Sequence, residues 1–117
     1  MTRIIIFVLL KLLILNSIVF SQSFPYSHYT TKDGLPNSVV ISTIQDKTGF
    51  MWFATEGGLS RFDGYNFTNF DENNGLISNE LVGMILTEDS IMYFAHLKEG
   101  ISVFKNNRFS KYEVKNL

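Results

Sequence analysis

The stretch DKTGFMWFATEGGLSRFDG, at residues 46–64, alternates turn-forming residues with short runs of apolar ones. Asp46 can accept hydrogen bonds from the backbone N–H groups of the turn that it opens, and Gly49 can adopt the positive φ that reverses the chain. Trp52 follows within an apolar run, and a ring of that size needs a buried layer. The two adjacent glycines after this run allow a second reversal. The stretch therefore predicts closely spaced antiparallel strands.

A weaker copy of the same pattern follows further along the chain. Residues 31–67 align with residues 72–109 at an offset of 41, which becomes 42 after one inserted residue near Glu99. The matched pairs include Gly34 with Gly75, Leu35 with Leu76, Ile44 with Ile85, Met51 with Met92, Phe53 with Phe94 and Phe62 with Phe104. One register kept over this length indicates a true repeat, and a period of about 40 residues is typical of solenoids, arrays and propellers.

Each repeat divides into four short runs of strand-forming residues. The runs are Val39–Ile44, Phe50–Thr55, Leu59–Phe62 and Tyr65–Phe70 in the first repeat, and Leu81–Leu86, Ile91–His96, Ile101–Phe104 and Arg108–Val114 in the second. Helical repeats would need longer apolar runs with helical periodicity. Four strands per period predict an all-β fold with about two four-stranded antiparallel blades of an incomplete β-propeller. We expect the first blade within residues 22–70 and the second, divergent blade within residues 71–117.

The predicted strands are apolar on both of their faces. In the run at residues 50–55, one face is formed by Phe50, Trp52 and Ala54 and the other by Met51, Phe53 and Thr55. A sheet with one solvated face would alternate apolar and polar residues. These strands therefore need packing neighbours on both sides, and blades packed face to face around an axis supply them.

Residues 1–21 have the pattern of a signal peptide that forms a helix during export. Arg3 precedes a long apolar stretch, and the composition then changes abruptly to polar and aromatic residues. Val19 and Ser21 fit the small-residue positions before a cleavage site, so Gln22 is the predicted first residue of the mature chain. An uncleaved N-terminal anchor is the alternative.

Charge and cysteine content argue against several classes of protein. The whole chain has a net charge of −1, and without residues 1–21 the remaining eight basic and eleven acidic residues give −3. The sequence has no basic stripe that could follow a phosphate backbone, which disfavours nucleic-acid binding. Because the sequence contains no Cys, disulfides and thiolate zinc sites are excluded.

The two histidines, His28 and His96, do not suggest a metal or catalytic site. They are 68 residues apart and have no carboxylates at ligand spacing, whereas a zinc site needs three or four converging ligands. We expect His96 to be a side chain at the rim of the fold. The sequence gives no reason to assign a metal, a cofactor or a catalytic residue.

The motifs resemble the two-component regulator propeller repeat, whose pattern is GLP followed by Asn or Ser, then D-x-x-G-x-x-W-x-x-T, then GGL and DG. The resemblance covers about residues 30–114. The blade-motif residues that it assigns are Gly34, Leu35, Asp46, Gly49, Trp52, Thr55, Gly57, Gly58, Asp63 and Gly64. The second copy departs from the pattern, because Thr87, Ser90, Tyr93 and His96 replace Asp46, Gly49, Trp52 and Thr55.

In that family such repeats build periplasmic sensor propellers of hybrid two-component histidine kinases, often from Bacteroidetes-type bacteria that respond to glycans. The resemblance implies an exported propeller segment that senses a signal or binds a ligand, within a longer protein. Its partners would be further propeller blades and a glycan or small-molecule signal, with membrane contact only through an uncleaved signal or a downstream segment. Any kinase activity would lie outside this chain, and no ligand-binding residue is assigned.

Two other functions also fit a propeller. A glycan-active hydrolase or lyase would need acidic pairs that converge on the axis, whereas a structural repeat protein of the envelope would need only the blades. Several aromatic residues could stack on a sugar ring, but their recurrence at equivalent repeat positions favours packing between blades. These residues are Tyr26, Tyr29, Tyr65, Phe67, Phe70 and Tyr112.

Overall fold

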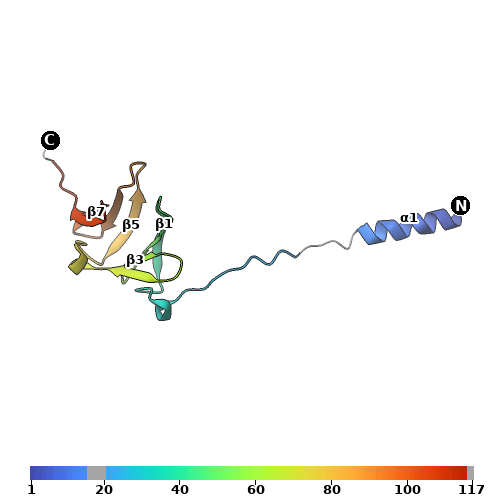
Figure 1. Ribbon diagram of the computed structural model, residues 1–117, viewed down its shortest axis with the longest axis horizontal. Helices are drawn as coiled ribbons and strands as arrows, with labels where there is room; N and C mark the ends of the chain where they lie inside the picture. The colour runs from blue at the N-terminus through green and yellow to red at the C-terminus, as the bar shows by residue number, and fades with distance from the viewer. Residues whose placement is uncertain (16–20, 116–117) are drawn as a thin grey trace.

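The computed structural model describes residues 1–15 and 21–115. The apolar N-terminal stretch forms α1 (Thr2–Leu15), which lies away from the sheets (Figure 1). Within the described ranges, no helix combines the length and the hydropathy that crossing a bilayer requires. Val19, one of the two residues that predict the cleavage site, lies outside the described residues.

The chain after residue 39 forms two four-stranded antiparallel sheets. Blade 1 contains β1 (Val40–Gln45), β2 (Met51–Thr55), β3 (Gly58–Phe62) and β4 (Phe67–Phe70), in that order across the sheet. Blade 2 contains β5 (Leu81–Leu86), β6 (Met92–His96), β7 (Gly100–Lys105) and β8 (Arg108–Lys111), in the same order. This topology confirms the predicted all-β fold of two propeller blades.

Most strand boundaries agree with the sequence-based prediction to within one residue, but two differ by two residues or more. β4 begins at Phe67 rather than Tyr65, because Asp63 Oδ1 accepts the backbone N–H groups of Tyr65 and Asn66, both at 2.8 Å, and holds them in a turn. β8 ends at Lys111 rather than at residue 114. The regular pairing with β7 ends at Lys111, opposite Ser102, although the backbone N–H of Tyr112 still donates to the carbonyl of Ile101 at 2.9 Å.

The first strands of the two blades lie next to each other. β1 and β5 contact each other, whereas β4 and β8 are the outermost strands of their sheets. β1 has a bulge between Val40 and Ser42, and β5 has one at the equivalent place, between Leu81 and Gly83. Because a bulge bends a strand and increases its twist, the two inner strands have the same local shape. Equivalent inner strands are what a radial arrangement of blades requires.

A short capped turn leads into each blade. The turn η1 (Thr31–Asp33) precedes blade 1, and η2 (Glu72–Asn74) precedes blade 2. Each has a reciprocal capping box and ends at a glycine in the left-handed region, with φ of 114° at Gly34 and 98° at Gly75. A positive φ is costly for residues other than glycine. Both turns therefore depend on glycine for the same backbone reason.

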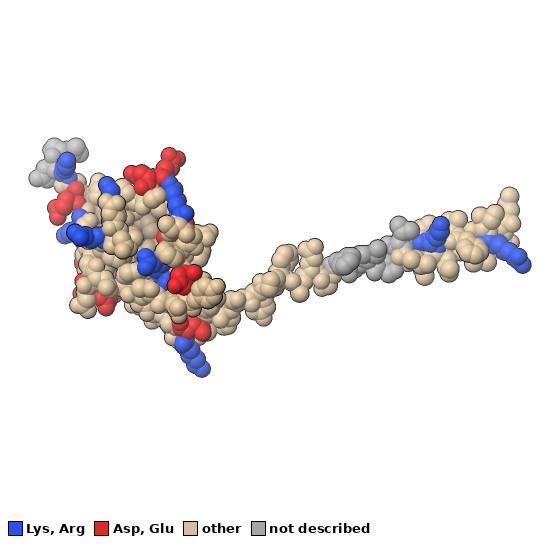
Figure 2. Space-filling model, in the orientation of Figure 1, with Lys and Arg blue, Asp and Glu red and all other residues tan. Residues whose placement is uncertain are grey.

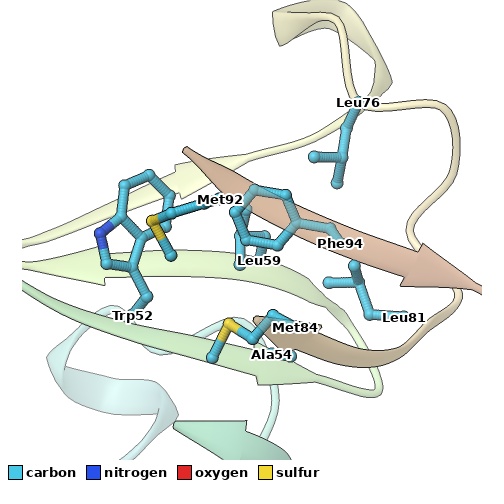
Figure 3. Close-up of a cluster of buried hydrophobic side chains, with 8 residues drawn as sticks. All are labelled: Trp52, Ala54, Leu59, Leu76, Leu81, Met84, Met92 and Phe94. Atoms are coloured by element: carbon cyan, nitrogen blue, oxygen red, sulfur yellow. The ribbon is translucent and has the colours of Figure 1, made fainter. Parts of the chain in front are cut away.

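The core lies between the blades (Figure 3). We define the front face of blade 1 as the face that carries Trp52, Ala54 and Leu59, and the rear face of blade 2 as the one that carries Met84, Met92 and Phe94. These two faces pack together. Trp52 is fully buried, and its ring centroid lies 5.8 Å from that of Phe94 and 5.1 Å from that of Phe104. The indole thus fills the layer between the blades.

The other two blade faces differ in how well they are covered. The rear face of blade 1 carries Phe62 and Phe67, and the ring of Tyr29 packs on both, at centroid distances of 4.7 and 5.7 Å. The front face of blade 2 is less covered, because among the described residues only the ring of Tyr112 packs on it, 6.0 Å from that of Tyr93. It forms an open apolar hollow of about 290 Å³ that includes Ile85 and Tyr93, and 61% of the Ile85 side chain is exposed.

Candidate functional site

The blade motif begins with the β1–β2 turn, which is organised by one carboxylate. Asp46 Oδ1 accepts the backbone N–H of Thr48 at 2.9 Å, the Thr48 hydroxyl at 2.6 Å and the backbone N–H of Phe50 at 3.0 Å. Its Oδ2 accepts the indole N–H of Trp52 at 2.8 Å. Partial burial alone raises the pKa of Asp46, but the hydrogen bonds outweigh burial and lower the pKa below its usual value. Asp46 is therefore a charged acceptor whose lone pairs are already engaged.

The β5–β6 turn of blade 2 keeps this shape with other residues. The backbone N–H of Thr87 donates to the carbonyl of Ile91 at 2.9 Å, as that of Asp46 does to Phe50. The Thr87 hydroxyl accepts the N–H of Ile91 at 3.2 Å and also contacts the Asp89 carboxylate. Ser90 stands in the position of Gly49 and has a φ of 67°. A hydroxyl and a strained serine thus replace the Asp and Gly of the first turn.

The glycine pair of the motif lies in the β2–β3 turn. Thr55 Oγ1 accepts the N–H of Gly57 at 3.2 Å and donates to the carbonyl of Gly58 at 2.8 Å. A Cβ added at Gly57 would lie 2.9 Å from the carbonyl oxygen of Pro36. The turn therefore packs directly against the segment that enters the blade, and only glycine fits there.

The remaining motif residues also lie in turns or in the interior. Leu35 is buried within the segment that enters blade 1. Gly64 has a φ of 103° in the β3–β4 turn that Asp63 organises. The hydrogen bonds from the backbone of Asn66 and Tyr65 lower the pKa of Asp63. The motif thus distributes its residues over three turns and the core, and it does not gather them into one pocket.

A cleft lies between the blades at the end formed by the β1–β2 and β7–β8 turns. Its volume is about 270 Å³, close to the lower limit of small-molecule sites. Its lining residues are Asp46, Lys47, Thr48, Phe50, Arg61, Leu86, Ser90, Met92, Phe104, Lys105, Asn106 and Asn107. Asp46 is the one blade-motif residue among them. Both blades contribute, so the cleft exists only when they pack together.

Arg61 is the best-positioned cation of this cleft. Its guanidinium carbon lies 4.8 Å from the ring centroid of Phe50, 5.5 Å from Trp52 and 5.4 Å from Phe70. Contacts of this kind with ring faces attract a cation and hold it in place. Among the described residues, the Arg61 side chain makes no hydrogen bond and no ion pair. Its charge acts on the nearby Asp63, but its fork of N–H donors can still bind an anionic or hydroxyl-bearing group.

The other polar groups of the cleft reinforce this preference. Lys47 and Lys105 add two further cations, and Asn106 and Asn107 form the β7–β8 turn with φ values of 51° and 59°. The one lining carboxylate, Asp46, already accepts four hydrogen bonds. On the face shown in Figure 2, basic and acidic side chains are interspersed over the blades. The lining of the cleft thus carries more cations than free carboxylates, although the charges of Lys105 and Lys47 also act on the nearby Asp89, whose pKa is lowered mainly by its hydrogen bond with Thr87.

The sequence did not single out the cationic residues of the cleft. Arg61 belongs to the first repeat and Lys105 to the second, so their proximity arises only from the packing of the blades. An Arg that follows the GGL motif is a usable signal, because it falls on the same face of the sheet as Trp52, its neighbour in register.

His96 is buried, and its prediction as a rim side chain is wrong. It is 6% exposed, and its Nε2 lies 2.7 Å from the Ser102 hydroxyl. The cause is its position in the repeat: His96 replaces Thr55, which is also fully buried at the end of its strand. Burial lowers the pKa of His96, and the nearby Glu99 and the Ser78 backbone offset this only in part. Its Nδ1 makes no hydrogen bond.

This histidine–serine pair does not form an active site. His96 and Ser102 lie in the interior of blade 2, and neither lines the cleft. Ser102 Oγ also accepts the backbone N–H of Ile77 at 3.1 Å, which ties it to the segment that enters the blade. A nucleophile needs access to substrate and donors for the oxyanion. Within the described ranges, no group of three or more His, Cys, Asp or Glu side chains is arranged to hold a metal ion.

Known proteins share both the motif and the arrangement of the blades. Residues 34–57, from the end of η1 to the β2–β3 turn, match the family described as two component regulator propeller. Histidine kinase P4 of Formosa agariphila is 40% identical over 53 residues, which are 45% of this chain. The extracellular domain of BT3049 from B. thetaiotaomicron, assigned as a hybrid two component system, has a TM-score of 0.66 and 31% identity over 76% of this chain.

The chain resembles the two-component regulator propeller family.

The similar proteins are much longer than the parts of them that this chain matches. The chain covers 4% of histidine kinase P4 and 14% of the BT3049 extracellular domain. Two blades are also fewer than the 4–8 that propellers typically contain. The matched region is thus a small part of each relative.

Proposed function

We propose that the chain is a segment of an extracytoplasmic propeller that senses a small-molecule signal for a hybrid two-component histidine kinase system. The cleft between the blades is the observation that carries the ligand-binding part of this proposal. It brings together Arg61, Lys47 and Lys105, while Asp46, its one carboxylate, is engaged in the turn. The family and the extracellular BT3049 match support the sensory role and the location.

The chemistry of the cleft suits a small acidic or hydroxyl-rich ligand, such as a sugar acid released from a glycan. Guanidinium and ammonium groups bind carboxylates, and side-chain amides bind hydroxyls. The rings of Phe50 and Phe104 add an apolar wall of the kind that sugar rings contact. We further propose that residues 1–21 direct export to the periplasm and that the chain itself has no enzyme activity.

A binding measurement with matched sugars tests this function. Glucuronate and its neutral counterpart glucose are titrated into the secreted protein, and the heat of binding is followed by calorimetry. We expect glucuronate to bind and glucose to bind at least about tenfold more weakly, because the charge pairing is absent.

The Lys105→Gln variant tests the role of the charge. Because Lys105 is exposed, its replacement removes one cation without disturbing the core. We expect it to weaken glucuronate binding and to leave the thermal unfolding temperature unchanged. Equal binding of the two sugars, or no binding of either, would contradict the cleft as the sensing site.

A further inference from the structure

A second pocket lies between the blades, beside the cleft and along their outer strands. Its volume is about 250 Å³, and it shares Arg61, Phe104 and Asn107 with the cleft. The rest of its lining comes from β4, the turn η2 and β8. These further lining residues are Phe70, Asn74, Arg108 and Phe109. We call this space the outer pocket.

Aromatic rings form the apolar wall of the outer pocket. The ring of Phe109 in blade 2 lies 5.2 Å from that of Phe70 in blade 1 and 4.7 Å from that of Phe104. The guanidinium carbon of Arg61 lies 5.4 Å from the ring centroid of Phe70. A guanidinium that stacks on rings still offers the N–H groups at its edge. The wall therefore holds one cation in place without using its donors.

The polar side chains of the outer pocket are mainly hydrogen-bond donors. Within the described ranges, the side chains of Arg61, Asn107 and Arg108 make no hydrogen bond and no ion pair. Asn74 Oδ1 accepts the backbone N–H of Asp71 at 2.9 Å, so its NH₂ group is the part left for a ligand. Because a guanidinium cannot accept a hydrogen bond, Asn107 is the one lining side chain with an unengaged oxygen.

The acidic residues nearby do not line the outer pocket. Asp71 caps the turn η2, where its carboxylate accepts the backbone N–H of Asn73 at 2.8 Å, and Glu72 begins that turn. The pKa of Asp63 is lowered mainly by the backbone N–H of Asn66, and the charge of Arg61 adds the smallest of the effects. The lining thus has two guanidinium groups and no carboxylate, which favours an anion.

The repeat alignment shows that this set of donors is particular to the interface between blades 1 and 2. Asn74 corresponds to Asp33 in the first repeat, and Arg108 corresponds to Asn66. Asp33 closes the capping box of η1 as Asn74 closes that of η2, so the turn itself does not require a neutral residue. Both replacements make the outer pocket more positive. A bound anion accounts for both of them, whereas capping does not account for either.

We propose that the outer pocket binds a sulfate group, either as the free ion or as a sulfate ester. The terminal oxygens of sulfate only accept hydrogen bonds, and they match two guanidinium groups and an amide NH₂ group. A phosphate ion near neutral pH keeps a proton that needs an acceptor, and an unpaired donor is costly. The proposal does not depend on a sugar acid in the cleft, because Asn74 and Arg108 do not line the cleft.

A nuclear magnetic resonance titration of the secreted protein tests the proposal. Every sample carries Ile85→Lys, which places a charge on the open face of blade 2 and disfavours association there. Sodium sulfate replaces sodium chloride at constant ionic strength, and the side-chain NH₂ signals of Asn74 and Asn107 are followed. We expect a saturable shift with sulfate, and binding at least about fivefold weaker with inorganic phosphate, because its proton lacks a charged partner.

A sulfate ester distinguishes the two sources of the group. Methyl sulfate is titrated in the same way, and its methyl group can contact the wall formed by Phe70 and Phe109. Tighter binding of methyl sulfate than of inorganic sulfate assigns an ester as the ligand, and weaker binding assigns the free ion.

Two variants of the lining and one control locate the site. Asn74→Asp returns a carboxylate to the outer pocket and keeps a residue type that closes the same capping box in η1. We expect it to weaken sulfate binding at least about tenfold and to leave the unfolding temperature in chloride unchanged. Arg108→Gln should weaken binding to a similar extent. Lys111→Gln is the control, because it removes an exposed cation from the same strand outside the pocket, and it should bind sulfate as the parent protein does.

Several results would overturn the proposal. Unchanged binding in Asn74→Asp, or equal weakening in Lys111→Gln, would show that sulfate responds only to the general charge of the surface. Equal weakening in Lys47→Gln would place the ion in the cleft instead, since Lys47 lines the cleft and not the outer pocket. A shift that never saturates, or equal affinity for phosphate, would also contradict a sulfate site.

Discussion

The indole N–H of Trp52 donates a 2.8 Å hydrogen bond to the carboxylate of Asp46, six residues earlier in the chain. The ring is fully buried between the blades, whereas the acid organises a turn at the surface. One bond therefore connects the β1–β2 turn to the layer between the blades. Because a buried indole N–H without a partner is costly, the Asp and the Trp of the motif depend on each other.

Trp52→Ala should destabilise a propeller that contains these blades by about 3–5 kcal/mol, the range for a large aromatic residue removed from a core. Chemical denaturation gives the free energy of unfolding. Trp52→Phe is the control, because it keeps a ring but removes the N–H, and its loss should be smaller. A loss below about 1 kcal/mol for Trp52→Ala would place the ring outside the core. Tyr93→Ala should act like Trp52→Ala once a further blade covers Tyr93.

Asp46→Asn should remove part of the acid sensitivity of the fold. The folded-state pKa of Asp46 lies below its ordinary value, so its charge stabilises the fold above the unfolded-state pKa, near 3.9. That contribution is lost as the pH falls through the folded-state pKa. Thermal unfolding between pH 7 and pH 2 should therefore depend less on pH in the variant. Glu113→Gln, at an exposed site, should keep the wild-type profile, and an identical profile for Asp46→Asn would contradict the role of the hydrogen bonds.

His96 should produce a second pH dependence at milder acidity. Burial lowers its folded-state pKa, so the unfolded chain binds a proton first and stability declines as the pH falls below about 6.5. The decline continues until the folded-state pKa is reached. In His96→Gln, the unfolding temperature should change less between pH 7.5 and pH 5.5. His28→Gln is the control, since His28 is exposed, and a matching loss of pH dependence in that variant would count against His96.

Export should remove residues 1–21, so that the secreted protein begins at Gln22. The prediction rests on the residues before the cleavage site and on the change of composition after them. N-terminal sequencing of secreted material checks it. Retention of Met1, or a start several residues away, would show that this reading of the N-terminus is wrong.

The mature chain, Gln22 to Leu117, should self-associate rather than form a well-ordered monomer. The front face of blade 2 is apolar and open, and exposed apolar surfaces of this kind associate or bind hydrophobic dyes. Size-exclusion chromatography and a thermal melt decide the matter. Ile85→Lys on the open face should reduce association and dye binding, whereas Val114→Lys, which lies outside the strands, should not. A sharp melt from a monodisperse wild-type monomer would contradict the prediction.

Local patterns in the sequence were sufficient to predict the blades. The 41-residue offset and the turn chemistry around Gly49 and Gly58 are local signals, and they fix the strands to within one or two residues in most places. The boundary at Tyr65 was misplaced because the Asp63 side chain accepts the backbone N–H groups of Tyr65 and Asn66. Strand propensity alone predicts that these groups belong to the sheet. Such competition between a turn and a strand depends on geometry.

The cleft was beyond sequence reasoning, because it depends on the angle at which two repeats pack. Arg61 looks like a surface residue in the sequence, yet three rings surround its guanidinium. His96 was misplaced for a related reason. His96 is buried because it takes the interior position that Thr55 occupies in the other repeat. The alignment of the repeats shows this equivalence, but the burial of Thr55 becomes evident only from the packing of the blades.

The matching capped turns at Gly34 and Gly75 also bear on how such genes change in length. Unequal crossing-over between the two coding segments would delete or add one period, and the product would still run from an outer strand through a capped turn into an inner strand. Each recombination event would therefore change the number of blades by one whole blade and would leave the pairing register of the strands unchanged. A change of ring size by one blade could then arise in a single genetic step.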